Sequence, residues 1–305
     1  MTIAEILTYL DQKGIHYSYS GDPKTTFSDY CPLNNIKPNS ITWVRHSEDA
    51  NIEKMNRIEG LVLFTELGVE FHNANFPIIQ VDNVHRSYFR VISHFFQAKD
   101  PEQHEPMIAS TAVIETDRIG KNVYIGHHTY IGPEVTIGDN VIILHNVTME
   151  GKVIIGNYTT IESGTTIGAC GFGHYWNEEK NPVAVPHLGG VVIGQHVKIG
   201  ANNAISRGCL SDTIIEDYVK TDNLCHIAHN DHIKHGAMLT ANSVISGSTV
   251  IGRNAWLAPG SLLNNAIEVG DNAFLGIGAV ATKNVPAGKI VVGMPAKVLR
   301  DREEK

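Results

Sequence analysis

The stretch YIGHHTYIGPEVTIGDNVIILHNVTMEGKVIIGNYTTIESGTTIG, residues 124–168, carries an aliphatic residue at every sixth position. A second small or β-branched residue follows most of these positions four places later, and glycine often comes directly after them. The same spacing begins earlier, and its aliphatic positions are Met107, Val113, Ile119, Ile125, Ile131, Ile137, Ile143, Met149, Ile155, Ile161 and Ile167. A fixed period of this kind is the signature of a repeat architecture.

The period of six identifies the repeating element as a short strand. Six is a multiple of the two-residue strand period but not of 3.6, so a helix would spread these positions around its circumference. Three short strands joined by glycine-relieved turns close a coil whose backbone groups pair with the coils on either side. The pattern is that of hexapeptide repeats and predicts a mainly β chain, a left-handed parallel β-helix.

Two interruptions divide the repeat. Residues 168–192 lack the pattern and are expected to form a loop thrown outward, after which hexads return at Ile193. A slip at residues 210–213 precedes a second long run, from Ile215 to Leu275. Together the runs predict roughly eight coils.

The first hundred residues have a different texture and predict a small α/β domain. Helices are expected near residues 3–10 and 85–97, the second capped by Asn83, and a polar helix at 47–57. Strand-like runs occupy 40–45, 60–65 and 77–81, and the charged stretch 98–106 is a candidate linker. We expect an α/β domain at 1–100, a β-helix domain at 101–284, and a C-terminal cap and tail at 285–305.

Composition narrows the function classes. The 305 residues are 42% hydrophobic and carry a net charge of −8 with scattered basic residues, which argues against nucleic acid as a partner. No apolar run is long enough for a membrane span and no export signal is found, so a cytoplasmic protein is expected. The cysteines fit no disulfide framework or metal pattern, and Cys209 and Cys225 are expected to be small core residues.

Three segments resemble a known family. They are GFG at 171–173, RGCLSDTII at 207–215 and DNLCHIAHN at 222–230. They are similar to those of the UDP-3-O-(3-hydroxyacyl)glucosamine N-acyltransferases of lipid A synthesis (LpxD), which have an α/β domain followed by a left-handed β-helix. The resemblance makes His229, in IAHN, the general base that takes the proton of the acceptor amine.

Other side chains of the same stretch are candidates for the site. Asp222 is a candidate carboxylate to orient His229, across a subunit interface rather than within one chain because seven residues place it on another side of the coil. Asn223 and Asn230 are expected to contact the acceptor. The resemblance also implies a homotrimer with sites between subunits.

Three further histidines invite a metal interpretation. His226, His232 and His235 are spaced by three, and β-helices also host zinc enzymes resembling γ-carbonic anhydrase. The repeat spreads them over successive faces, so we expect solvated surface histidines and no metal; a metal enzyme is kept as a lesser alternative.

The repeat also predicts where the acyl donor lies. Residues eighteen apart stack in one column, which aligns His229, Gly247, Asn265 and Lys283. Three coils span roughly 14 Å, comparable to a pantetheine arm. A thioester at His229 is therefore expected to run past Gly247 and Asn265 and to place its phosphates near Lys283.

The C-terminal residues 276–300 depart from the family. With a G-x-P-A-K motif at 293–297 they resemble the ending of sugar acetyltransferases that use acetyl-CoA, and the family's second histidine is replaced by Ala266. The short tail DREEK is therefore expected to lack the helices that meet acyl carrier protein in that family. The expected function is therefore transfer of a short acyl group, acetyl or hydroxyacyl, from acyl-CoA to the amine of a dTDP- or UDP-linked amino sugar. The product would serve lipopolysaccharide or surface glycan synthesis. The alternative is the LpxD reaction proper, in which acyl carrier protein carries the acyl group.

The nucleotide of the acceptor is expected to bind the N-terminal domain. In the segment matching the family's uracil site, Trp43 takes the aromatic place and His46 the amide place. Tyr175 and Trp176, in the loop 168–192, are expected to close over the sugar.

Overall fold

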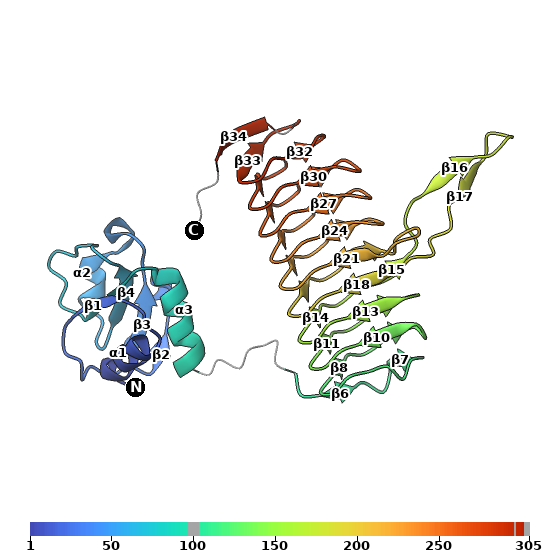
Figure 1. The fold of residues 1–305 in the computed structure, drawn as a ribbon. Coiled ribbons are helices and arrows are strands. Elements are labelled where there is room, and N and C mark those ends of the chain that lie inside the picture. The colour runs from blue at the N-terminus through green and yellow to red at the C-terminus, as the bar shows by residue number, and fades with distance from the viewer. Residues whose placement is uncertain (97–103, 296, 302–305) are drawn as a thin grey trace. The chain divides into compact units, whose positions relative to one another are not determined.

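The chain is described from a computed structural model, which places residues 1–96, 104–295 and 297–301. It consists of two compact units, Met1–Gln103 and His104–Lys305, drawn in Figure 1. The predicted linker at 98–106 falls largely outside the described residues. None of the described helices is long and apolar enough to cross a membrane.

The first unit is a five-stranded sheet with helices. Strands β2 to β5 run parallel in the order β5-β4-β3-β2, and β1 pairs antiparallel with β5. The strands are β1 (Tyr17–Ser20), β2 (Asp29–Tyr30), β3 (Ser40–Trp43), β4 (Val62–Glu66) and β5 (Ile78–Val81). The three central strands lie where their apolar runs predict them, whereas the short and largely exposed β1 and β2 had no such signal.

Local capping explains both long helices of this unit. Thr2 and Glu5 form a capping box at the start of α1 (Ile3–Gln12), and Asn83 Oδ1 accepts from Arg86 N at 2.9 Å at the start of α3 (Val84–Phe95). The polar helix predicted at 47–57 is wrong as one element. It divides into η2 (Ser47–Asp49) and α2 (Ile52–Met55), because Asn51 caps a new helical turn; a further turn is η1 (Leu33–Asn35).

The second unit is a parallel β-helix with three faces, each a sheet of short strands (Figure 1). The nine-stranded face holds β7 (Val113–Ile114), β9 (Tyr130–Ile131), β12 (Thr148–Met149), β15 (Thr166–Ala169), β20 (Ala204–Ser206), β23 (His226–Ile227), β26 (Val244–Ile245), β29 (Leu262–Leu263) and β32 (Val280–Ala281). The seven-stranded face holds β10 (Val135–Ile137), β13 (Val153–Ile155), β18 (Val191–Ile193), β21 (Thr213–Ile215), β24 (His232–Ile233), β27 (Val250–Ile251) and β30 (Glu268–Val269). The eleven-stranded face holds β6 (Met107–Ile108), β8 (Tyr124–Ile125), β11 (Ile142–Ile143), β14 (Thr160–Ile161), β19 (Lys198–Ile199), β22 (Lys220–Thr221), β25 (Met238–Leu239), β28 (Trp256–Leu257), β31 (Phe274–Leu275), β33 (Lys289–Val292) and β34 (Lys297–Asp301).

The six-residue repeat builds the core of this unit. Its aliphatic positions from Ile125 to Leu275 are buried, and the second inward positions, such as Val147 and Ala255, fill the space between them. Within the described residues the nine-stranded face gives nine coils, close to the roughly eight predicted. The difference arises at the ends, where weaker hexads still pair with the ladder, and β33 and β34 form an antiparallel hairpin beyond it.

Both interruptions of the repeat leave the helix at the same corner. Residues 170–190 run out between β15 and β18 into a hairpin of β16 (His174–Trp176) and β17 (Pro182–Ala184), which projects from the coils in Figure 1. Residues 207–212 leave between β20 and β21. Pairing resumes in register after each, Val153 with Val191 and Val191 with Thr213, so the core is undisturbed.

Candidate functional site

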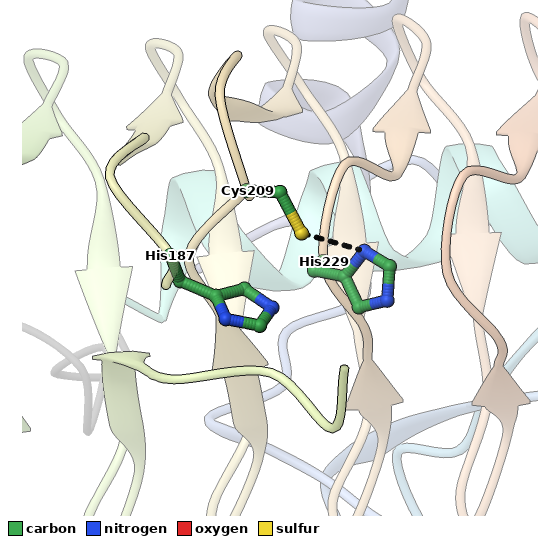
Figure 2. Close-up of side chains that lie close together, drawn as sticks. All are labelled: His187, Cys209 and His229. Carbon is green, nitrogen blue, oxygen red and sulfur yellow. Dashed lines mark hydrogen bonds between the residues drawn. The ribbon is translucent and has the colours of Figure 1, made fainter. Parts of the chain in front are cut away.

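The candidate functional side chains meet at the corner between the nine-stranded and seven-stranded faces, which we call the site corner. His229 and Asn230 lie on it between β23 and β24, in the coil that follows the two excursions. The longer excursion returns through His187 and the shorter one carries Cys209. Three segments distant in sequence therefore meet because the coils stack, as Figure 2 shows.

Asn230 orients the His229 ring. Asn230 adopts a left-handed backbone conformation, φ 62°, which Asn tolerates, and its amide Nδ2 donates to Ser211 O at 3.0 Å. Its Oδ1 therefore faces the other way, accepting from Cys209 N at 3.0 Å and lying 3.1 Å from His229 Nδ1. Since a carbonyl oxygen only accepts, Nδ1 carries the proton and Nε2 carries the lone pair of a base.

The face of the His229 ring lies over Gly247 of the next coil. A Cβ at Gly247 would stand 2.7 Å from both Cε1 and Nε2 of His229, closer than any van der Waals contact. The absent side chain is thus what leaves room for the ring and keeps Nε2 open. Pairing of Ile227 with Ile245 fixes this stacking.

The predicted column continues along the site corner. Ile245 pairs with Leu263 and Leu263 with Ala281, so Gly247, Asn265 and Lys283 follow one another in register. Asn265 and Lys283 are exposed, and Lys283 borders a hollow of about 220 Å³. The column is thus present in the fold, and its role in donor binding stays a prediction.

Asp222 and Asn223 lie on a different corner, between the eleven- and nine-stranded faces. The Asp222 carboxylate accepts from Asn223 N at 2.8 Å and from Ala241 N at 3.3 Å, and Asn223 Oδ1 accepts from Ala201 N at 2.7 Å. Within the described part of the chain no hydrogen bond joins Asp222 to His229. Within one chain, the side chain that orients His229 is Asn230. From the sequence, Asn230 is predicted to contact the acceptor substrate.

The aromatic candidates divide between the two units. Trp43 is half-buried at the end of β3, packed edge-on against His85 at 5.5 Å between ring centroids and near Phe89, while His46 is exposed. Tyr175 and Trp176 are exposed on β16, in the projecting hairpin. Their predicted roles in binding the acceptor stay predictions.

Sequence reasoning missed His187 and misplaced Cys209. His187 is 7% exposed and its ring centroid lies 5.4 Å from that of His229. Cys209 was expected in the core like Cys225, but the slip at 210–213 takes it out of the repeat, so it is half-buried with Sγ 3.8 Å from His229 Nδ1. The glycines of the GFG segment let the chain pass close by: a Cβ at Gly171 would stand 2.8 Å from His187 Nε2 and 2.9 Å from His229 Cβ.

The three neighbouring histidines do not converge. His226 is half-buried, and burial lowers its pKa. His232 Nε2 lies 2.7 Å from Glu216 Oε1, and the ring of His235 lies against Tyr218. The dispersal over faces is as predicted, and each of the three side chains is partly exposed at the surface.

A buried acid follows the site directly. Asp231 occupies an inward position of the repeat and is 0% exposed, with Oδ1 accepting from Thr249 N at 2.8 Å. Burial raises its pKa to about 8. The carboxyl is therefore largely protonated below that pH. The sequence indicated this buried acid only by placing an aspartate at an inward position of the repeat.

Comparisons with known proteins identify the hexapeptide repeat and relate the chain to N-acyltransferases. The family profile described as bacterial transferase hexapeptide (six repeats) matches residues 118–151 and 134–169. UDP-3-O-acylglucosamine N-acyltransferase 2 of Legionella pneumophila (strain Lens) is 45% identical over 152 residues, 50% of this chain and 44% of the relative. UDP-3-O-acylglucosamine N-acyltransferase 1 of Francisella tularensis (strain SCHU S4) is 32% identical over 267 residues, 81% of this chain and 75% of the relative.

A solved structure supports the fold. LpxA, a UDP-N-acetylglucosamine acyltransferase from Bacteroides fragilis, superposes with a TM-score of 0.58 at 27% identity, covering 64% of this chain and 74% of that one. The likeness confirms the predicted left-handed β-helix. The aligned part of the chain spans less than half the length of the Legionella relatives and three quarters of the Francisella one.

These relatives correct one prediction. Because residues 276–300 resemble the ending of acetyl-CoA-dependent enzymes, the sequence predicted transfer of a short acyl group from CoA to a dTDP- or UDP-linked amino sugar. That prediction is wrong: the relatives are named for N-acylation of UDP-3-O-acylglucosamine, the alternative reaction. A capping hairpin closes the end of a β-helix whatever donor is used, so it carries no information on the donor.

Proposed function

Because the chain belongs to the family of UDP-3-O-acylglucosamine N-acyltransferases, we propose that it transfers an acyl group from a thioester to the amine of UDP-3-O-acylglucosamine. The observation that carries the proposal is the state of His229. Its Nδ1–H is held by Asn230 and its Nε2 is open above Gly247.

The reaction follows from that tautomer. The acceptor ammonium first releases one proton to solvent, and His229 Nε2 then removes a second proton as the neutral amine nitrogen attacks the thioester carbonyl. A C–N bond forms, the C–S bond breaks, and the proton on Nε2 passes to the leaving thiolate. Asn230 stabilises the ring throughout, since its Oδ1 accepts from Nδ1 whether the imidazole is neutral or charged.

The donor is proposed to be an acyl chain on the pantetheine arm of acyl carrier protein, as the resemblance implies. The arm would lie along the site corner past Gly247 and Asn265 toward Lys283, whose ammonium is suited to a phosphate. The acceptor's uridine is proposed to use Trp43 and His46. A homotrimer is proposed, in which Asp222 reaches His229 of a neighbouring subunit.

Acyl transfer from hydroxyacyl carrier protein to UDP-3-O-acylglucosamine tests the proposal. His229→Ala should lower kcat by roughly 10² to 10⁴-fold with little change in KM, because only proton transfer is lost. His235→Ala is the matched control, since His235 occupies the same repeat position at the next corner without the Asn230 contact. Full activity in His229→Ala, or none in the wild-type protein with these substrates, would refute the function.

A further inference from the structure

Three metal-ligand side chains converge at the site corner. The ligand atoms of His187, Cys209 and His229 all lie within 4.8 Å of one another, and Figure 2 shows the His187 ring and the Cys209 sulfur on the same side of His229. The mechanism proposed above uses neither His187 nor Cys209. Two imidazoles and a thiol are the donor set that zinc favours in proteins.

His187 is already arranged as a ligand. Its Nδ1 lies 2.9 Å from Val185 O, and because a carbonyl only accepts, Nδ1 carries the proton and Nε2 is bare. Nε2 is buried and has no hydrogen-bond partner among the described residues, in a side chain only 7% exposed. An imidazole whose second nitrogen donates to a backbone carbonyl is the usual arrangement of a metal-bound histidine.

We propose that a zinc ion binds His187 Nε2, Cys209 Sγ and His229 Nδ1. With Zn–N near 2.1 Å and Zn–S near 2.3 Å, tetrahedral geometry separates ligand atoms by roughly 3.4 to 3.6 Å. Cys209 Sγ and His229 Nδ1 are 3.8 Å apart, so this pair is close to that spacing, and small rotations of the His187 ring bring Nε2 to the ion. Water takes the fourth position.

Binding would switch His229 off, a consequence that rests on the proposed function. In the free protein the single imidazole proton is on Nδ1 and Nε2 is the base. An ion on Nδ1 requires that proton to be on Nε2, which removes the lone pair that accepts from the amine. The Cys209 thiol loses its proton to solvent, so one proton is released for each ion bound. Asn230 Oδ1 keeps its bond from Cys209 N.

Metal binding is tested without substrate, on the full chain stripped with chelator. Isothermal titration with Zn²⁺ in two buffers of different ionisation enthalpy should give one ion and one released proton per chain. Co²⁺ should give a thiolate-to-cobalt charge-transfer band. Cys209→Ser and His187→Gln should each weaken Zn²⁺ binding at least tenfold, and Cys209→Ser should abolish the band. Cys170→Ala removes an exposed cysteine from the excursion that carries His187, and it should change neither the Zn²⁺ affinity nor the cobalt band.

Acyl transfer provides the second readout. At a zinc concentration ten times its own Kd, wild-type protein should lose about 90% of its chelator-treated rate, while Cys209→Ser and His187→Gln should lose at most about half of their own chelator-treated rates. Binding that Cys209→Ser leaves unchanged, or a cobalt spectrum without the thiolate band, overturns the site. An intact site without inhibition would overturn the switch, and an inactive wild-type protein with intact Zn²⁺ binding would overturn only the proposed function.

Discussion

Replacing Gly247 by alanine tests the geometry on which the proposed base depends. The new Cβ would start 2.7 Å from His229 Cε1 and Nε2 and 3.1 Å from Cδ2. Contact between such atoms requires about 3.5 Å or more, so the ring must move by roughly 1 Å. Pairing of β23 with β26 holds the two backbones, and the displacement therefore falls on the imidazole.

A shift of that size should be costly for the reaction. Misplacement of a reacting group by roughly 1 Å lowers rates by about 10²-fold, and the methyl group also covers Nε2. We therefore expect kcat of Gly247→Ala to fall by about two orders of magnitude in the acyl-transfer assay. The thermal unfolding midpoint should change little, because the position is at a corner and outside the core.

Gly132→Ala is the matched control. Gly132 lies at the same corner in an earlier coil, and a Cβ there would stand 3.1 Å from Met149 O and contact no histidine. Its kcat should stay within about twofold of wild type. A folded Gly247→Ala protein with wild-type kcat would refute the assignment of Nε2 as the reacting atom.

Three further predictions concern the buried acid, the donor column and the cysteines. Burial raises the Asp231 pKa from 3.8 to about 8, so the unfolded chain releases its proton first and stability falls as pH rises from about 4 to about 8. The free energy of unfolding, measured with urea in the presence of chelator, should fall by the order of 5 kcal/mol over this pH range in the wild type and not in Asp231→Asn. Asp117→Asn, which changes an exposed carboxylate, should keep the fall. Parallel pH profiles of wild type and Asp231→Asn would contradict this prediction. Lys283→Ala should raise the donor KM severalfold more than it lowers kcat, and an unchanged KM would remove Lys283 from the donor path. Burial raises the Cys225 pKa to about 11, so at pH 8 a thiol reagent should modify exposed Cys170 long before Cys225; equal rates would contradict the buried placement.

The repeat made most of the fold predictable because it states strand, face and coil at once. Once Ile227, Ile245 and Leu263 are known to stack, the neighbourhood of His229 and Gly247 follows by counting. The same counting separates Asp222 from His229. It fails where the count is interrupted: nothing in the spacing says that the excursion after β15 returns a histidine to the site corner.

The donor prediction failed for a related reason. Residues 276–300 end the β-helix with a hairpin, and the G-x-P-A-K motif belongs to that ending rather than to a reacting group. The contact of Asn230 with the acceptor stays a prediction, whereas its contact with His229 was not predicted, because the sequence does not reveal which of the two amide atoms of Asn230 faces the ring. The tautomer of His229 depends on that choice, and it became visible only with the positions of Ser211 and Cys209.

Excursions that leave and rejoin at one corner have a consequence for how such a chain can diverge. Val153 still pairs with Val191, and Val191 with Thr213, although segments of unequal length intervene. Loop length at that corner is therefore uncoupled from core packing. Insertions there can supply or withdraw groups such as His187 while the imidazole they approach stays fixed, so control of the reaction can evolve separately from the reaction itself.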